Sequence, residues 1–342
     1  MKPEPSQPMS LPPPRPIARI DCHTHVGFDA LFYLQGWSPY CLDIPRLFLE
    51  AEDAAMDALI VFPFISYLGL DQEALLSNRI ELPETSRVTP YEFENRRLCE
   101  EIQQQPPEQR GRLWPLLIAD PGRRQAQQVE AWRRLPSDYV VHGIKIQGTI
   151  IQSKVIRLLD EGACLLDYAE EHDLPLLIHS SIKPSDEWSQ CADLLRVAEA
   201  RPRVRFILAH SCRFHLPSLQ RVAELPNTWF DCSAHVIHCQ CAVANLPGVA
   251  IPAERFPTDY SSPERVLRDL AEAFPEKLIW GSDAPYHSIH YEHVRMQSSY
   301  RREVACLDAL PADLRDRVCR RNTLAWLRGR GLPQRAKAED FL

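Results

Sequence analysis

Two histidines, His23 and His25, stand one residue apart where a short apolar run ends, in the segment IARIDCHTHVG. In an extended strand the side chains at i and i+2 point to the same face, so both imidazoles could reach one ion. Imidazole suits zinc, manganese and iron, with bonds to zinc of roughly 2.1 Å. The pair alone also fits a half-exposed strand end without any ligand. A metal site therefore requires further ligands from other strand ends.

Four more ionisable residues share this position, at or near the end of an apolar run. They are Lys145 in VHGIKIQG, His179 in LPLLIHS, His210 in VRFILAHS and Asp283 in KLIWGSDA. Each has a structural explanation when taken alone, because a strand-end histidine often only hydrogen-bonds, a lysine can pair with an acid and an aspartate can cap a turn. Taken together they predict a metal centre, provided that the runs end at one place in the fold.

Eight apolar runs predict the strands that would position these residues. They cover residues 17–25, 57–64, 112–120, 141–148, 174–180, 204–211, 228–233 and 277–284. From the middle of the chain onward the runs alternate with amphipathic segments at intervals of about thirty residues, as expected of βα units. Apolar residues at helical spacing predict helices over 155–169 and 188–198, and Ser262-Pro263-Glu264 has the residue types of a helix start.

This alternation predicts an α/β fold, a distorted (β/α)₈ TIM barrel over residues 17–330. The carboxyl ends of the strands in such a barrel meet at one mouth, which would gather the ionisable residues. A doubly wound open sheet is the alternative, but no Gly-rich phosphate turn follows the first strand. Residues 65–111, after the second strand, and 234–262, after the seventh, are expected to be long loops that cover the mouth.

The ends of the chain are expected to lie outside the barrel. Residues 1–16, MKPEPSQPMSLPPPRP, have the composition of an extended tail of polyproline type and lack the apolar region of a secretory signal. Apolar positions within residues 291–330 predict closing helices, and residues 331–342 form a C-terminal tail.

Composition limits the partners. The chain has 342 residues and a formal net charge of −7, which argues against nucleic acid or an anionic membrane as the main partner. No apolar run approaches the roughly 20 residues that span a bilayer. Eleven cysteines without a C-x-x-C predict reduced thiols and a cytoplasmic location, and Cys239 and Cys241 match no zinc-ribbon spacing and are expected in a loop. A small-molecule substrate is the expected partner, and a homo-oligomer is left open.

As a set, the motifs resemble the amidohydrolase superfamily, and more closely its amidohydrolase-related branch of metal-dependent barrel hydrolases and decarboxylases. The similar segments are HTH with the first-strand HxH motif, HGIKIQG with the lysine strand, LIHS and ILAHS with the fifth- and sixth-strand histidines, IWGSDAP with the eighth-strand aspartate motif, and RVCRRNTLAWL with the closing helix. The resemblance covers about residues 17–330.

The resemblance implies one or two divalent ions, with zinc as the first choice and manganese or iron as alternatives. His23, His25 and Asp283 would bind the first ion. A binuclear site would be completed by Lys145, His179 and His210, and a neutral Lys145 could form a bridging carbamate with carbon dioxide. In mononuclear members of the branch His179 binds the single ion and His210 becomes a catalytic acid or base. Both arrangements are open at this point.

The expected reaction is metal-assisted hydrolysis of an amide, ester or lactone bond of a small molecule. A metal-activated water would attack the carbonyl, and Asp283 would take the proton of this water and pass it to the leaving group. A metal or His210 would polarise the carbonyl oxygen. A nonoxidative decarboxylase with one metal is the alternative, followed by an iron-dependent oxygenase. Arg213 could meet a substrate carboxylate, and His235 and His287 are further candidates for substrate binding.

Overall fold

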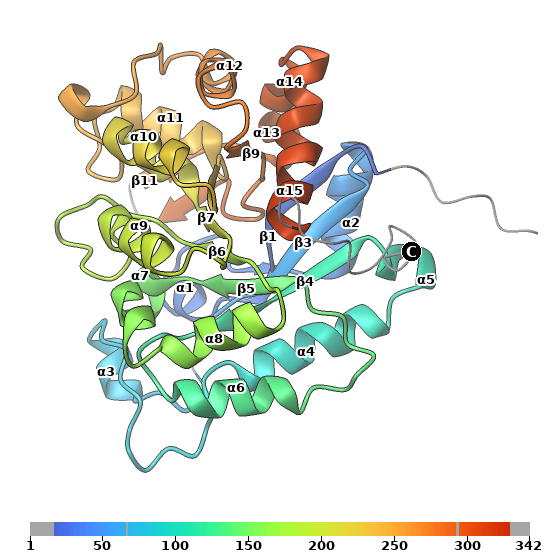
Figure 1. The fold of residues 1–342 in the computed structure, drawn as a ribbon, viewed down its shortest axis with the longest axis vertical. Coiled ribbons are helices and arrows are strands. Elements are labelled where there is room, and N and C mark those ends of the chain that lie inside the picture. Colours follow the sequence, from blue (N-terminus) through green and yellow to red (C-terminus); the bar gives the residue numbers. More distant parts are fainter. Residues whose placement is uncertain (1–16, 66–67, 292–293, 329–342) are drawn as a thin grey trace, which may run out of the picture.

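The computed structural model describes residues 17–65, 68–291 and 294–328. The tails predicted at 1–16 and 331–342 lie outside these residues. Within the described ranges, nine strands form one sheet in the order β2-β1-β3-β4-β5-β6-β7-β8-β9, with helices packed around it (Figure 1). All eight predicted strands are present and parallel. They are β1 (Ile20–Phe28), β3 (Ala58–Pro63), β4 (Leu113–Ala119), β5 (Gly143–Ile146), β6 (Leu176–Ile178), β7 (Phe206–Leu208), β8 (Thr228–Asp231) and β9 (Leu278–Ile279).

Backbone hydrogen bonds join β1 to the segment that follows β9. The amide of Cys22 donates to the carbonyl of Trp280 at 3.3 Å, the amide of Asp283 to the carbonyl of His23 at 2.9 Å, and the amide of His25 to the carbonyl of Ala284 at 2.7 Å. The prediction of a distorted (β/α)₈ barrel is therefore confirmed. The same hydrogen bonds bring Asp283 beside the two histidines of β1.

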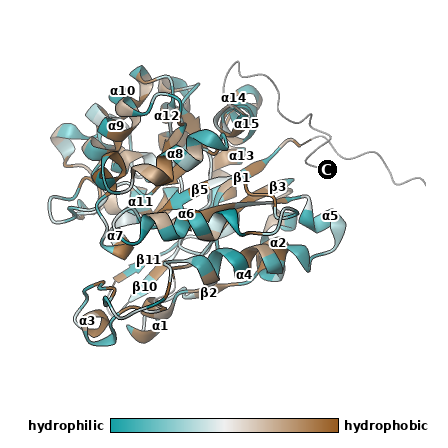
Figure 2. Cartoon of the chain, turned by 60° about the horizontal axis from the view of Figure 1, so that its bottom comes forward, coloured by the Kyte–Doolittle hydropathy of each residue, from teal (hydrophilic) through white to brown (hydrophobic). Residues whose placement is uncertain are grey.

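Amphipathic helices cover the outside of the sheet. The main ones are α2 (Ile44–Asp53), α4 (Glu92–Gln103), α6 (Gln125–Arg133), α8 (Ala163–Glu171), α9 (Cys191–Ala200), α10 (Leu216–Glu224), α12 (Pro263–Ala273) and α13 (Tyr300–Asp308). Their apolar sides pack on the strands, while hydrophilic residues lie on the outer side of helices such as α4 and α6 (Figure 2). Inside the barrel, a separate apolar cluster that includes Ile20, Leu177, Ile207 and Trp229 fills the space below the mouth.

Two helices are shorter than their sequence patterns predict. The segment predicted as one helix over 155–169 is a 3₁₀ helix (Val155–Leu159) followed by α8, because the chain turns at Asp160 and the amide of Gly162 bonds back to the carbonyl of Arg157. Helix α9 begins at Cys191, so Trp188 lies before it. Helix α12 starts after Ser262, as predicted, although the Ser262 side chain makes no capping hydrogen bond.

The predicted loops contain short elements of their own. Residues 65–111 include α3 (Gln72–Leu76), α4 and α5 (Pro107–Arg110), and residues 234–262 include α11 (His235–Val243) and a 3₁₀ helix (Pro252–Glu254). The prediction that Cys239 and Cys241 lie in a loop is therefore wrong, because both lie on α11. Between β1 and α2 the chain forms α1 (Ala30–Leu34) and the antiparallel strand β2 (Cys41–Leu42), and α7 (Gly148–Ile151) follows β5.

The C-terminal region is helical only from residue 300. Before it, β10 (Ile289–Tyr291) and β11 (Val294–Met296) form an antiparallel hairpin, so the prediction of helix from residue 291 is wrong for its first residues. After α13 come α14 (Ala312–Asp316), a π-helix (Arg317–Arg321) and α15 (Asn322–Arg328). No helix in the described ranges is long and apolar enough to cross a bilayer. The eleven cysteines, all within those ranges, are free thiols.

Candidate metal centre

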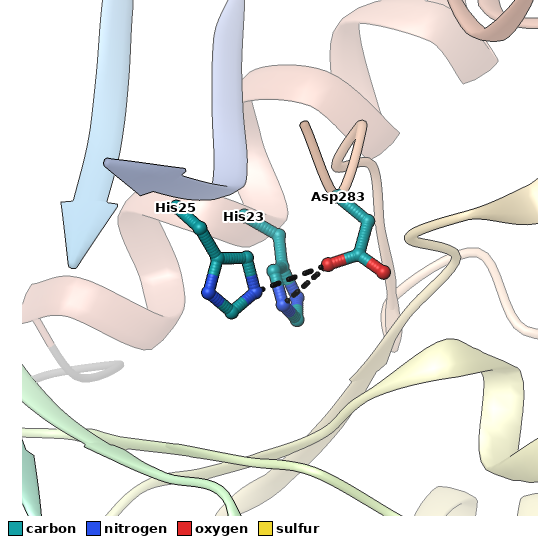
Figure 3. A group of neighbouring side chains, drawn as sticks. All are labelled: His23, His25 and Asp283. Atoms are coloured by element: carbon teal, nitrogen blue, oxygen red, sulfur yellow. Dashed lines mark ion pairs between the residues drawn. The ribbon is translucent and has the colours of Figure 1, made fainter. Parts of the chain in front are cut away.

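Three of the predicted ligands converge at the mouth. The imidazoles of His23 and His25 and the carboxylate of Asp283 are buried and point toward one another (Figure 3), with one ligand atom of each within 4.8 Å of the others. The Nε2 atoms of His23 and His25 lie 3.1 and 3.3 Å from the Oδ1 atom of Asp283. Two imidazole nitrogens and a carboxylate oxygen in this arrangement are a typical donor set for zinc, and the residues therefore fit a divalent ion.

Local backbone conformation creates this convergence. The register of β1 against β3 shifts between Asp21 and Thr24, next to His23. Asp283 has a φ of 62°, a left-handed conformation that turns its carboxylate back toward β1. Gly281 permits the close approach, because a Cβ at that position would lie 2.7 Å from the Cβ of His23. Steric contact with His23 thus explains the glycine in the sequence Gly-Ser-Asp that follows β9.

Asp231 at the end of β8 orients the first ligand. Its Oδ2 atom lies 2.9 Å from the Nδ1 atom of His23. A carboxylate only accepts hydrogen bonds, so Nδ1 of His23 carries a proton, and Nε2 is the atom of this ring that could bind an ion. Burial acts to raise the pKa of Asp231, but the His23 imidazole and hydrogen bonds from Ser233 and His210 lower it below its usual value. Sequence reasoning missed Asp231, although it ends an apolar run as the predicted residues do.

Lys145 on β5 lies beside this group. Its Nζ atom is 3.1 Å from the Nε2 atom of His23 and 4.7 Å from the centre of the Phe62 ring. The side chain is fully buried, and burial lowers its pKa to about 8. A lowered pKa makes the neutral amine, which is the form that reacts with carbon dioxide, easier to reach near neutral pH.

The other two predicted histidines form a second group with Arg213. The Nδ1 atom of His179 lies 3.0 Å from the Nε2 atom of His210, and the Nε2 atom of His179 lies 3.0 Å from Nη2 of Arg213. Burial, and then the charge of Arg213, lowers the pKa of both imidazoles well below the usual value. The Nη1 atom of Arg213 also contacts His238 on α11, a residue outside the predicted ligand set.

The two groups approach each other through Asp283 and His210. The Oδ2 atom of Asp283 is 3.8 Å from the Nδ1 atom of His210, and the His23 and His210 rings have centroids 5.4 Å apart. The structure therefore brings His23, His25, Lys145, His179, His210, Arg213 and Asp283 to one mouth.

The two remaining candidates for substrate binding, His235 and His287, have contacts of their own outside the two groups. The Nε2 atom of His235 is 2.8 Å from the carbonyl oxygen of Pro263, so this imidazole bonds to the start of α12. His287 is 9% exposed and lines a cavity of about 430 Å³ beside α2 and α13, together with Glu50 and Tyr300. Burial lowers the pKa of both imidazoles to about 4. Both residues were chosen because they follow a strand end closely in the sequence, and that criterion did not predict the contact of His235 with Pro263 or the position of His287 in this cavity.

Comparisons with known proteins agree with this architecture. The sequence matches the family model described as amidohydrolase over residues 20–329. A search of curated proteins gives no match. Among solved structures, the chain is similar to an amidohydrolase from Burkholderia multivorans with bound zinc, with 15% identity, a TM-score of 0.57 and coverage of 90% of this chain and 98% of that one.

Two other similar structures have different activities in their names. A dihydroorotase from Campylobacter jejuni has 15% identity and a TM-score of 0.51, with coverage of 89% of this chain and 81% of that one. A 2,6-dihydroxybenzoate decarboxylase from Rhizobium has 12% identity and a TM-score of 0.56, with coverage of 91% and 98%. At these identities the likeness concerns the fold, which accommodates both reactions.

Proposed function

Since the chain belongs to the amidohydrolase family, we propose that it is a metal-dependent hydrolase that cleaves an amide, ester or lactone bond of a small molecule. The observation that carries this proposal is the convergence of His23, His25 and Asp283 on one buried point. A divalent ion bound there, with zinc the best fit to the donors, would lower the pKa of a water molecule toward about 7 and polarise a carbonyl group.

Asp283 is the proposed proton shuttle. Its Oδ1 atom faces both imidazoles of β1, whereas Oδ2 lies on the side of His210. A carboxylate in this position can accept a proton from the attacking water through Oδ2 and return it to the leaving group. His210, 3.8 Å away, is close enough to orient that oxygen or to contact the carbonyl of the substrate.

Arg213 suggests that the substrate carries a carboxylate. A guanidinium has five N–H donors. Three of them are taken by the carbonyl of Ser180 at 2.9 Å and by the imidazoles of His179 and His238. Among the described residues no carboxylate forms an ion pair with Arg213, so the two remaining donors can bind a substrate carboxylate in bidentate fashion.

Nonoxidative decarboxylation is the second candidate. The observation in its favour is again the position of Arg213. A carboxylate held by this guanidinium would lie beside the neutral imidazoles of His179 and His210 rather than beside Asp283. In that reaction the bond to the carboxyl group breaks, carbon dioxide leaves, and a proton takes its place on carbon, so no oxygen from water enters the organic product.

The experiment measures metal content and three products on one panel of substrates. Small esters, lactones and amides that carry a carboxylate are incubated with the zinc-loaded protein in H₂¹⁸O. Hydrolysis predicts release of acid with ¹⁸O in the new carboxyl group, and Asp283→Asn serves as the inactive control. Carbon dioxide release without ¹⁸O incorporation would favour the decarboxylase. Oxygen uptake by the iron-loaded protein would favour an oxygenase.

A further inference from the structure

Helix α1 and the segment between it and β2 expose a group of aromatic side chains at the mouth end of β1. Phe28, Tyr33 and Leu34 are 48%, 56% and 64% exposed. The ring of Tyr40 lies 5.1 Å from that of Tyr33 and 6.0 Å from that of Phe28, measured between centroids. We call these four residues the rim patch. Single exposed apolar residues are common, but exposed aromatic rings in mutual contact mark an interaction surface.

The helix that carries the rim patch has no polar face. Helix α1 has the sequence ALFYL, and its buried side is formed by Phe32, whose ring packs against Trp37 and Tyr286. Its exposed side is formed by Tyr33 and Leu34, so the helix is apolar all round (Figure 2). A helix of this kind is normally covered on both sides in a globular protein. The outer side of α1 is therefore a surface to which a partner can bind.

The rim patch combines uncharged rings with hydrogen-bond donors. Residues 27–42 contain one charged side chain, Asp29, which is buried and accepts from the amide of Phe32 and the hydroxyl of Tyr286. The phenol hydroxyls of Tyr33 and Tyr40 form no hydrogen bond to another residue that the structure describes. Aromatic surfaces of this composition bind proline-rich segments, because rings pack on rings and hydroxyls donate to the carbonyl groups between the prolines.

A segment with the matching chemistry precedes the described residues. Residues 12–16 have the sequence PPPRP, and seven of the sixteen residues before Ile17 are prolines. Proline has no backbone N–H, so the carbonyl groups of such a run have no donors within the run and accept hydrogen bonds from elsewhere. The fixed φ of proline also reduces the conformational entropy that is lost on binding.

The length of chain before β1 decides which copy can supply this run. Ile17 precedes the first residue of β1, whereas Phe28 is its last residue. A strand of nine residues spans roughly 26 Å at about 3.3 Å per residue. A polyproline segment rises about 3.1 Å per residue, so residues 12–16 reach at most roughly 16 Å beyond Ile17. The run is therefore too short to reach the rim patch of its own chain.

We propose that the rim patch binds residues 12–16 of a second copy of this chain. The phenol hydroxyls of Tyr33 and Tyr40 donate to the carbonyl groups of the run, and the ring of Phe28 packs against its prolines. Two copies that exchange their runs form a closed dimer, in which the same two surfaces are used twice. This inference is independent of the metal centre and of the reaction proposed above.

Sedimentation velocity of the full chain tests the proposal. We expect a monomer–dimer equilibrium. Tyr33→Ser should raise the dimer dissociation constant by roughly tenfold or more, which corresponds to about 1.4 kcal/mol. Replacement of prolines 12–14 by alanine should have an effect of the same size. The combined variant should be little worse than either one, because both changes remove the same contact. Leu76→Ser, at an apolar residue of α3 that is 82% exposed, is the matched control and should leave the constant unchanged.

A synthetic peptide of residues 8–16, PMSLPPPRP, provides a second measurement. It should compete with the run of the second copy and shift the full chain toward the monomer, whereas the peptide with alanine at positions 12–14 should not. A full chain that stays monomeric up to roughly 0.1 mM would overturn the proposal. A dimer that is unaffected by the proline replacements and the peptide would overturn it as well. If Tyr33→Ser does not fold, these two measurements decide.

Discussion

The two sides of the barrel mouth use the same residue type in different ways. On the side of β1 and β9, the Nε2 atoms of His23 and His25 face a carboxylate oxygen of Asp283. On the side of β6 and β7, the nitrogens of His179 and His210 face each other, Arg213 and Ser233. The difference lies in the partner of the second ring nitrogen. A carboxylate on Nδ1 leaves Nε2 of His23 as the atom that could bind an ion, whereas a guanidinium on Nε2 of His179 leaves Nδ1 of that ring to face His210.

The partner of an imidazole, rather than the presence of the imidazole, therefore decides whether it can bind metal. One carboxylate, Asp231, serves both sides. It accepts from Nδ1 of His23, from the amide of His210, and from the amide and hydroxyl of Ser233. His23 and the pair His179 and His210 are consequently fixed relative to each other by a single side chain.

His23→Ala should have the largest effect. Removal of this ligand should abolish tight metal binding and lower turnover by more than the roughly 100-fold that loss of an outer partner costs. Metal content and hydrolysis rate measure the two effects. The melting temperature in the presence of zinc should fall as well, since an ion bound only by the folded state stabilises that state.

His179→Ala is the matched control from the other side of the mouth. It should keep about one equivalent of zinc while turnover falls, because its nitrogens bind protein groups. If His179→Ala lost metal as completely as His23→Ala, the two sides would not differ as described, and His179 would have to be counted as a ligand.

Asp283→Asn should rank next. The substitution keeps the shape and one oxygen donor but removes the basic carboxylate, so turnover should fall by roughly 10²- to 10⁴-fold, the usual contribution of a positioned acid–base group. Metal should be retained in part because the two histidines remain. Turnover near the wild-type level with zinc bound would move the proton transfer to the other side of the mouth, where His210 is the nearest group.

Asp231→Asn should have an intermediate effect that reaches both sides. The amide can donate as well as accept, so the proton on Nδ1 of His23 is no longer required and the imidazole is less well oriented. We expect zinc affinity to fall by about 10- to 100-fold, as for other outer partners of metal-binding histidines. Calorimetric titration with zinc measures the change.

Asp231→Glu and Ser233→Ala separate the two connections of Asp231. The glutamate keeps the charge and should restore part of the zinc affinity. Ser233→Ala breaks only the link to His210, and should lower turnover with little change in affinity. Unchanged zinc affinity in Asp231→Asn would contradict the assigned role.

The sequence alone predicts the barrel and the gathering of its ionisable residues, for a clear physical reason. Parallel strands end at the same edge, so residues such as Lys145 and His210 must meet once the eight strands are recognised. Hydrogen-bond direction is different, because it depends on groups far apart in the chain. The contact between His23 and Asp231 joins residues 208 positions apart, and no local sequence pattern predicts it.

The local elements that were not predicted also have physical reasons. Strand β2 has two residues, too few for an alternating pattern, and hairpin β10–β11 precedes a helix whose apolar spacing dominates that region. The left-handed turn at 210–214 contains no glycine or asparagine, the residues that normally signal such a conformation. Its stability comes from tertiary contacts, which the sequence does not display.

The buried carboxyl groups of Asp231 and Glu303 have pKa values shifted in opposite directions, and the prediction drawn from this contrast has the smallest expected effect. Asp231 receives four hydrogen bonds and has a lowered pKa. Glu303 on α13 is fully buried, accepts from the hydroxyl of Ser298 at 2.6 Å and from the amide of Val236 at 3.3 Å, and lies near the charge of Asp283. Burial, with a smaller contribution from Asp283, raises its pKa to about 8. Asp231 is thus held as an anion and Glu303 as a neutral acid.

Glu303→Gln should make the protein less sensitive to alkaline pH. The folded-state pKa of Glu303 lies above the usual value of 4.5, so the stabilisation from this group is complete below about pH 4.5 and is lost as the pH rises through about 8. Glutamine stays neutral, and the difference in melting temperature, variant minus wild type, should increase between pH 6 and pH 9. The increase should be a few degrees, since 1 kcal/mol corresponds to about 2–4 °C for domains of 150–250 residues. A difference that is constant with pH would show that Glu303 does not titrate in this range, and its contrast with Asp231 would then be unfounded.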